Sequence, residues 1–232
     1  MKNLAVGSAF RNAAGNVQAY FERIKALQVL LDKTGIGLRV IAGEGDSTDN
    51  TKALLRAVGH SSGIPVDIAD CSHGGPEYGS TEQPERLAAL STVLNRILDV
   101  VNDGDDLFLY IEQDLLWEPE TVKRLIKRWV SNTHFDILAP MVMAGECFYD
   151  VWGFRHLDGS RFGPFYPFSN LLDHRSGEIL EVGSVGSCLL MPGRTARDTR
   201  VYDGNALVGW CAMARATGHK IGVVPDLRVR QA

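Results

Sequence analysis

Residues 106–117 read DLFLYIEQDLLW, in which the apolar run 107–111 ends abruptly at two acids, Glu112 and Asp114. A short apolar run bounded by polar residues predicts a strand buried on both faces of a sheet. Open α/β sheets bind their ligands at the carboxyl ends of such strands. In extended chain, residues two apart point to the same side, so we expect both carboxylates to face one site.

The chemistry of this acid pair favours a hard divalent cation. Mg²⁺ and Mn²⁺ prefer carboxylates, waters and substrate phosphates as ligands. The alternative is a solvated loop after a strand, because short motifs match many unrelated sequences. The rest of the chain has to decide between these two interpretations.

The flanking sequence alternates between strand and helix patterns. Strands are expected at 3–9, 38–42, 66–69, 135–143, 181–191 and 220–224, and helices at 17–31, 52–58, 86–101, 119–129 and 207–217. Repeated strand–helix units predict an α/β fold of the Rossmann type, with a mainly parallel central sheet and helices on both faces.

One long segment, residues 145–173, is rich in glycine and aromatic residues and shows no clean periodicity. Such a segment inside a compact domain is typical of a functional loop or lid. Its residues Tyr149, Asp150 and Trp152 combine rings with an acid, a mixture that suits contact with a sugar. The alternative is a hydrophobic minicore in which Asp150 caps a turn.

Composition sets broader limits. The chain has 232 residues, 45% of them hydrophobic and 22% charged, which is typical of a globular protein. Its formal net charge of -4 does not indicate a nucleic-acid binder, although a local basic groove stays possible. The N-terminal residues resemble neither a signal peptide nor a membrane span, so a cytoplasmic protein is expected. The four cysteines are scattered and are expected to be reduced and buried.

Several motifs together resemble a known family. GEGDSTDNT (43–51) is similar to the DDGSTD loop of GT-A glycosyltransferases, and YIEQD (110–114) is similar to their DxD metal motif. FYDVWGFR (148–155), EVGSVGSCLLM (181–191) and GWCAMARATGHKIGVVPDLRV (209–229) resemble the fungal mannan-polymerase and capsule-associated mannosyltransferases. The resemblance implies one GT-A domain over 1–232, with a nucleotide-binding part at 1–118 and an acceptor-side part at 119–232.

The resemblance also implies an activity: transfer of a hexose from a nucleotide-sugar, GDP-mannose or a UDP-sugar, to a hydroxyl of a glycan or another acceptor. Asp114 is then a catalytic metal ligand for Mn²⁺ or Mg²⁺, and Glu112 reaches the ribose or the metal. Glu44 accepts hydrogen bonds from the base or ribose. Arg11 and Arg86 are placed to bind the nucleotide or its phosphates, with surface salt bridges as their alternative.

The sequence departs from the family pattern in two places. Inverting relatives carry an acidic base before the last strand, where residues 205–209 here read NALVG; Asp203 is the nearest acid and is either the base or a turn residue. A histidine that many relatives carry after the last strand is missing from residues 228–232, RVRQA. We therefore expect transfer with retention. The competing hypotheses are a non-catalytic sugar-binding subunit and a nucleotidyltransferase, although a basic glycine-rich phosphate loop does not follow the first strand.

Overall fold

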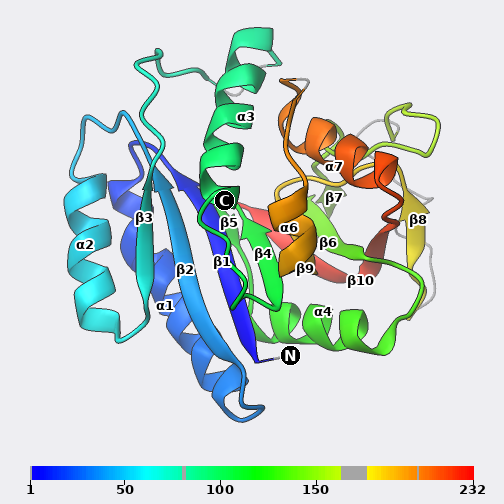
Figure 1. Ribbon diagram of the computed structural model, residues 1–232, viewed down its shortest axis with the longest axis horizontal. Helices are drawn as coiled ribbons and strands as arrows, with labels where there is room; N and C mark the ends of the chain where they lie inside the picture. Colours follow the sequence, from blue (N-terminus) through cyan, green and yellow to red (C-terminus); the bar gives the residue numbers. More distant parts are fainter. Residues whose placement is uncertain (1, 80–81, 163–176, 203) are drawn as a thin grey trace.

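A mixed β-sheet forms the centre of the molecule in the computed structural model, which describes residues 2–79, 82–162, 177–202 and 204–232 (Figure 1). Within these ranges ten strands form one sheet, with the path β3-β2-β1-β4-β9-β6-β10-β5, while β7 pairs with β6 and β8 with β10. The predicted α/β class, with helices on both faces, is confirmed: α3 and α6 lie in front of the sheet in Figure 1 and α1 lies behind it.

The first half of the chain builds the parallel part of the sheet. Its elements are β1 (Asn3–Phe10), α1 (Ala14–Asp32), β2 (Gly37–Glu44), α2 (Thr51–Ser62), β3 (Val66–Asp70), α3 (Pro84–Leu98) and β4 (Leu107–Ile111). The pairs β2 with β3, β1 with β2 and β1 with β4 are all parallel. Every residue of β4 is buried, as its apolar run predicts.

The second half departs from a simple parallel order. Its elements are β5 (Leu115–Leu116), α4 (Pro119–Ser131), β6 (Ile137–Ala144), β7 (Cys147–Phe148), β8 (Leu180–Val182), β9 (Cys188–Pro192), α6 (Gly193–Asp198), α7 (Ala206–Ala216) and β10 (Ile221–Gln231). Strand β9 runs antiparallel to both of its neighbours, β4 and β6. The two parallel parts of the sheet are thus joined through one reversed strand.

The single strand expected at 181–191 is wrong, because this stretch forms two strands with different partners. Strand β8 pairs with β10, whereas β9 pairs with β4 and β6. The glycines between them are points of close approach: a Cβ on Gly183 would overlap with the carbonyl oxygen of His156, and one on Gly186 with the carboxylate of Asp150. They mark a place where the chain crosses other segments instead of continuing a strand.

Helix packing encloses the core on both sides of the sheet. Behind it, the Tyr20 ring of α1 packs edge to face on Phe10, with centroids 5.2 Å apart. In front of it, the Trp210 ring of α7 packs on Phe108 and Tyr110 of β4 at 6.1 and 6.4 Å. In the described ranges, none of the helices combines the length and the apolar character needed to cross a membrane.

Candidate functional site

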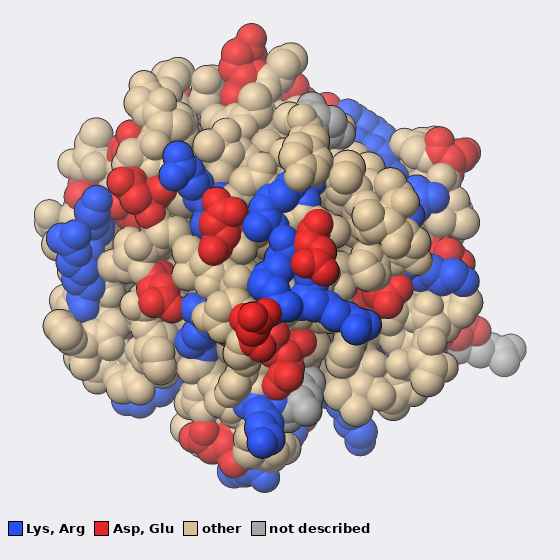
Figure 2. Space-filling view, in the orientation of Figure 1, with Lys and Arg blue, Asp and Glu red and all other residues tan. Residues whose placement is uncertain are grey.

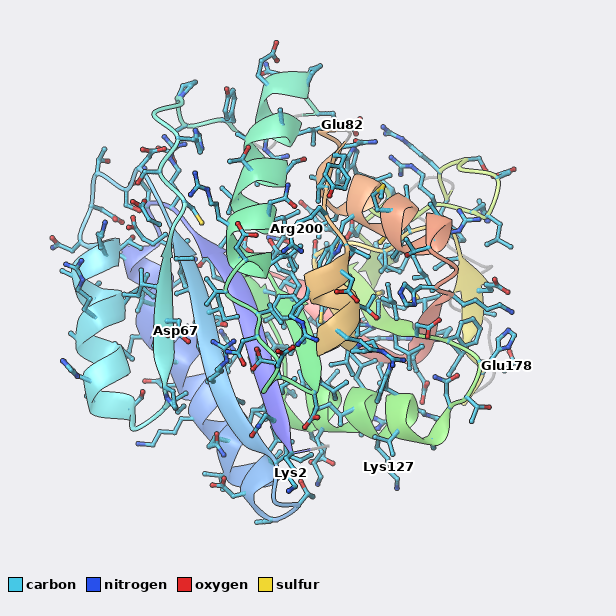
Figure 3. All side chains as sticks on the ribbon, viewed as in Figure 1. Lys2, Asp67, Glu82, Lys127, Glu178 and Arg200 are labelled. Atoms are coloured by element: carbon cyan, nitrogen blue, oxygen red, sulfur yellow. The ribbon has the colours of Figure 1, made fainter. Side chains whose placement is uncertain are left out.

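A cleft of about 490 Å³ opens at the carboxyl end of β4, and we call it the acid cleft. Its walls come from α3 and the segment before it, from β4 and the β4–β5 turn, from the segments after β7 and before β9, from the start of α7 and from the end of β10. The lining residues are Tyr78, Gly79, Glu82, Arg86, Leu90, Leu94, Tyr110, Glu112, Asp114, Tyr149, Asp150, Val151, Trp152, Gly186, Ser187, Ala206, Leu207 and Gln231. Figure 3 labels Glu82 at the rim, near the end of α3 that faces α7. The structure therefore brings six of the candidate site residues together in one cleft: Arg86, Glu112, Asp114, Tyr149, Asp150 and Trp152.

A second cleft, of about 540 Å³, lies at the opposite end of β4. Its acids are already bonded within the protein. Asp105 accepts a hydrogen bond of 2.8 Å from Arg39 Nε, and Asp106 accepts from the backbone N–H groups of Lys2 and Asn3. Carboxylates satisfied in this way hold the fold together, so the acid cleft is the better candidate for ligand binding.

The two acids after β4 lie in a tight turn, the acid turn (residues 112–115). The amide of Leu115 donates to the carbonyl oxygen of Glu112 at 3.2 Å. The extended geometry expected for Glu112 and Asp114 is therefore wrong, because the chain reverses here to form β5, which pairs antiparallel with β10. Both side chains still line the cleft.

The carboxylate of Asp114 is held by a residue of β10. Its Oδ2 atom accepts a hydrogen bond of 3.0 Å from Nε2 of Gln231, the last residue of β10. The backbone of Gln231 also pairs with Leu115, so the same residue contacts the turn twice. No sequence pattern points to Gln231, since a single glutamine at the end of a strand belongs to no motif.

Asp150 occupies a fitted pocket in the wall of the acid cleft. It is only 7% exposed, and it accepts hydrogen bonds from the Gly153 amide at 2.8 Å and from Ser187 Oγ at 3.2 Å. Gly153 and Gly186 leave room for its carboxylate. Ser187 was missed by the sequence analysis, because its only local signal is a place beside a glycine.

The irregular segment is part minicore and part cleft wall. Phe154 packs against Phe148 and Phe162, with centroids 4.9 and 6.4 Å away, and Asp150 caps the turn at Gly153. The guanidinium of Arg155 lies 5.9 Å from the centre of the Trp152 ring. The minicore interpretation therefore holds for residues 145–162, while contact of this segment with a sugar stays a prediction; residues 163–173 lie outside the described residues.

Acidic side chains outnumber basic ones among the described residues that line the cleft. Four carboxylates, Glu82, Glu112, Asp114 and Asp150, and one guanidinium, Arg86, stand among its described lining residues. Burial, with the nearby charges of Asp150 and Asp114, raises the pKa of Glu112 to about 7. Burial also raises the pKa of Asp150, against the hydrogen bonds that it accepts. Carboxylates confined together in this way favour the binding of a cation.

Whether a divalent metal fits can be judged from the donor atoms. Within the described part of the chain, no three Asp, Glu, His or Cys side chains come close enough to enclose an ion. Mg²⁺ and Mn²⁺ do not need such a cage, because one or two carboxylates with waters and substrate phosphates satisfy them. Asp114 and Glu112, which line the same cleft, fit that requirement.

Arg11 and Glu44 do not line the acid cleft. Arg11 donates to the carbonyl oxygens of Gly75 and Pro76 at 2.8 and 2.9 Å. Glu44 is 2% exposed and lies 3.6 Å from Lys52 Nζ. Strand β1 separates β2 from β4, so Glu44 is not on the strand next to the acid turn. Contact of these two residues with a nucleotide stays a prediction. Asp203 lies outside the described residues.

Arg11 instead belongs to a group of bonded loops, the loop network (residues 11–14, 45–51 and 71–77). Asp46 Oδ2 accepts from the amides of His73 and Gly74 at 2.9 and 3.1 Å, and these bonds lower the pKa of Asp46. The loop network lies at the carboxyl ends of β1, β2 and β3, on the same edge of the sheet as the acid cleft.

Backbone strain also gathers at this edge. The non-glycine residues with positive φ in the described ranges are Asn12, Asp46, Ser187 and Ala206, with φ of 47°, 57°, 39° and 47°. Asn and Asp tolerate this region, whereas for Ser and Ala it is strained. Ser187 and Ala206 both line the acid cleft, and strain of this kind clusters at functional sites.

The face shown in Figure 2 bears on nucleic-acid binding. Basic and acidic side chains are interleaved across it. Arg39 pairs with Asp67 and Asp105, and Arg200 pairs with Asp99. These pairs balance part of the positive charge of the molecule, and nucleic-acid binding stays as the sequence left it, possible but not indicated.

Comparison with known proteins supports the fold class that the sheet and the cleft define. The chain has the GT-A fold, a Rossmann-like fold with its site at the carboxyl edge of the sheet. No protein-family model and no curated protein sequence matches it.

Three solved structures show the likeness. The mannosyltransferase PcManGT from Pyrobaculum calidifontis, in complex with GDP-Man and Mn²⁺, superposes with a TM-score of 0.63 at 14% identity, over 99% of this chain and 56% of that one. S. aureus TarS 1-349 gives 0.57 at 13%, over 99% and 60%. A UTP-bound UGPase from Acinetobacter baumannii gives 0.52 at 13%, over 98% and 86%. The chain thus spans just over half the length of the first two.

Proposed function

We propose that the chain is a metal-dependent glycosyltransferase that moves a hexose from a nucleotide-sugar to an acceptor hydroxyl, with retention of the anomeric configuration. The observation that carries the proposal is the acid cleft, where the acid turn, Asp150 and Arg86 face one another at the carboxyl end of β4. A nucleotide diphosphate would be repelled by these carboxylates unless a cation bound with it. The neighbour crystallised with GDP-Man and Mn²⁺ supports this combination.

The metal, when bound, would stabilise negative charge on the leaving diphosphate. Asp114 and Glu112 would hold it, with Gln231 fixing the carboxylate of Asp114. Arg86 would bind a phosphate oxygen through its guanidinium, since Arg is the side chain best suited to such planar contacts.

The sugar would lie against the opposite wall of the cleft. Tyr149 and Trp152 offer half-buried rings to its apolar face, and Asp150 can accept hydrogen bonds from its hydroxyls. The nucleoside would extend toward the loop network, where Glu44 and Arg11 are the proposed contacts for base, ribose or phosphate. The donor would be GDP-mannose or a UDP-sugar, and the acceptor a glycan or another molecule with a free hydroxyl.

Retention is proposed because residues 205–209 at the start of α7 contain no acid. In retaining transfer the acceptor oxygen bonds to the anomeric carbon as the bond to the diphosphate breaks, and the acceptor proton passes to that diphosphate. No protein base is then required on the opposite face. With retention, Asp203→Asn is therefore expected to cost little, whereas a large loss of activity would make Asp203 the base.

A nucleotidyltransferase is the second candidate, and the 86% coverage of the UGPase chain favours it. The three residues Arg11, Asn12 and Ala13 that join β1 to α1 include no glycine, which speaks against a phosphate-binding loop there. The third candidate is a subunit that binds nucleotide-sugars in the same cleft but does not transfer the sugar.

One experiment separates the three. The protein is incubated with a panel of GDP- and UDP-sugars and simple sugar acceptors, and in parallel with sugar phosphates and GTP or UTP, each with Mn²⁺ or with EDTA, while thermal unfolding and products are recorded. A glycosyltransferase releases GDP or UDP only with the metal, and proton NMR of the fresh product gives the anomer. A nucleotidyltransferase instead forms pyrophosphate from sugar phosphate and nucleoside triphosphate, and a binding subunit is stabilised without product. Asp114→Asn is the control that should remove turnover.

A further inference from the structure

Two hydroxyl groups are buried in the core close to the acid turn. Ser8 lies on β1 and Tyr20 on α1, and both are 0% exposed. Burying a hydroxyl without a hydrogen-bond partner destabilises a folded protein. The hydrogen-bond partners of these two side chains therefore indicate their structural role.

The two hydroxyls form a series of hydrogen bonds in which every donor can be assigned. Ser8 Oγ donates to the carbonyl oxygen of Ile111 at 2.5 Å, and the Tyr20 hydroxyl lies 2.7 Å from Ser8 Oγ. A carbonyl oxygen can only accept, so the serine proton is committed to Ile111 and Tyr20 must donate to Ser8. Burial raises the pKa of Tyr20, so its phenol keeps the proton that this arrangement needs.

This series of hydrogen bonds ends where the pairing of β4 with β1 stops. The parallel pairing of these strands runs from Leu4 with Leu107 to Gly7 with Tyr110 and stops one residue before Ile111. On the other edge of β4, Ile111 still pairs with Cys188, a residue of β9. The serine hydroxyl thus supplies the hydrogen bond that Ile111 needs on the β1 side, immediately before the acid turn.

We propose that the Ser8–Tyr20 hydroxyl pair positions the acid turn. By holding the carbonyl oxygen of Ile111, it sets the direction in which the chain enters the turn and hence how Glu112 and Asp114 face the cleft. Ser8 and Tyr20 are positioning residues, since they act through the backbone and do not line the cleft. Their effect on metal binding rests on the proposed function, whereas their effect on the turn does not.

The molecule contains a matched control on the other side of β4. Trp210 Nε1 donates to Thr199 Oγ1 at 2.7 Å, and Thr199 Oγ1 donates to the carbonyl oxygen of Thr195 at 2.7 Å. This is also a ring donor, a buried hydroxyl and a backbone acceptor in series. None of the three lines the acid cleft. Thr199→Val therefore removes the same kind of bond at a comparable depth, away from the acids.

The test compares Ser8→Ala, Ser8→Thr, Tyr20→Phe and Thr199→Val in the full chain. Thermal unfolding measures stability, hydrogen exchange measures protection of the Leu115 amide, and electron paramagnetic resonance of free Mn²⁺ gives the affinity for that ion. Ser8→Ala should speed exchange at Leu115 and weaken Mn²⁺ binding by about 10-fold, as loss of a positioning partner typically does. Ser8→Thr should restore both, and Tyr20→Phe should give a smaller change in the same direction. Thr199→Val should lower the melting temperature without either effect.

Unchanged exchange at Leu115 in Ser8→Ala would overturn the proposal, as would equal losses of Mn²⁺ affinity in Ser8→Ala and Thr199→Val. If the wild type binds no Mn²⁺, the metal in the proposed function is wrong, and the exchange comparison alone decides the positioning role. If Ser8→Ala does not fold, the comparison of Tyr20→Phe with Thr199→Val takes its place on the same two readouts.

Discussion

The acid cleft and the loop network lie on the same edge of the sheet and are both rich in acids, yet their carboxylates are in opposite states. In the loop network, donors from the protein lower the pKa of Asp46 and of Asp49, the latter chiefly through the Thr51 hydroxyl. In the acid cleft, burial and like charges raise the pKa of Glu112 and burial raises that of Asp150. Carboxylates already bonded to the protein hold loops in place, whereas those facing one another keep their capacity for a ligand.

The largest effect should come from Asp114→Asn, which takes one negative charge from the acid turn and keeps the shape of the side chain. We expect transfer to fall by about 100-fold or more, because stabilisation of the leaving group is lost. The melting temperature should stay close to that of the wild type, since Asp114 is half-buried at the sheet edge. Steady-state rates with Mn²⁺ and a thermal melt check both. Normal turnover would show that the metal lies elsewhere.

The next effect concerns the pocket around Asp150. Gly186→Ala would place a methyl group against the Asp150 carboxylate, where no room exists. Overpacking of this kind costs about 1–3 kcal/mol, and the displaced acid should also weaken donor binding. Thermal melts and the KM for the donor measure the two effects.

The control for this substitution is Gly15→Ala in α1, where an added Cβ meets nothing within 4 Å. It should leave activity unchanged and stabilise the fold slightly. A Gly186→Ala protein as active and as stable as Gly15→Ala would mean that the pocket adapts and that Asp150 is not fixed by it.

A smaller effect should appear in the dependence of stability on pH. Glu112 has a folded pKa of about 7, above its unfolded value of about 4.3, so between these values the folded state binds more protons than the unfolded state. Stability therefore falls as pH rises through this window. Glu112→Gln should melt higher than the wild type at pH 8 in EDTA, with the difference shrinking toward pH 5. A difference that does not vary with pH would contradict the raised pKa.

The smallest effect is expected for Asp46→Asn in the loop network. The lowered pKa of Asp46 means that its contribution to stability is present above its unfolded value and is lost as pH falls through the folded value. The variant should melt slightly below the wild type at pH 7 and equal to it in strong acid. The value of kcat should not change. A fall in kcat at constant stability would place Asp46 in the chemistry and would remove the contrast between the two regions.

The sequence predicts the parallel half of the fold well, because its signals are local. The buried strand at 107–111 follows from its bounded apolar run, and the helix α1 follows from the helical spacing of its apolar residues. The reversed strand β9 could not be predicted in this way, since its direction depends on partners far along the chain.

The same distinction applies to the candidate site. Glu112 and Asp114 stand at the end of an apolar run, so pattern and spacing identify them. Gln231 contacts Asp114 of the acid turn across 117 residues, and Ser8 contacts Ile111, the residue before the turn, across 103 residues. A polar residue that acts at such a distance leaves no periodic signal in its own neighbourhood.

Those separations also bear on the order in which the molecule folds. Ile111, the residue before the acid turn, is bonded to β1, and Asp114 within the turn is bonded to β10, so the turn reaches its native geometry only after strands from both halves of the chain have joined the sheet. Contacts of such long range form late, because the entropy lost in closing a long loop opposes them until other contacts in the sheet offset that loss. A folding intermediate with a nearly complete parallel half would therefore lack an ordered Glu112 and Asp114, the proposed metal ligands. Recovery of Mn²⁺ binding during refolding should lag behind recovery of helical signal.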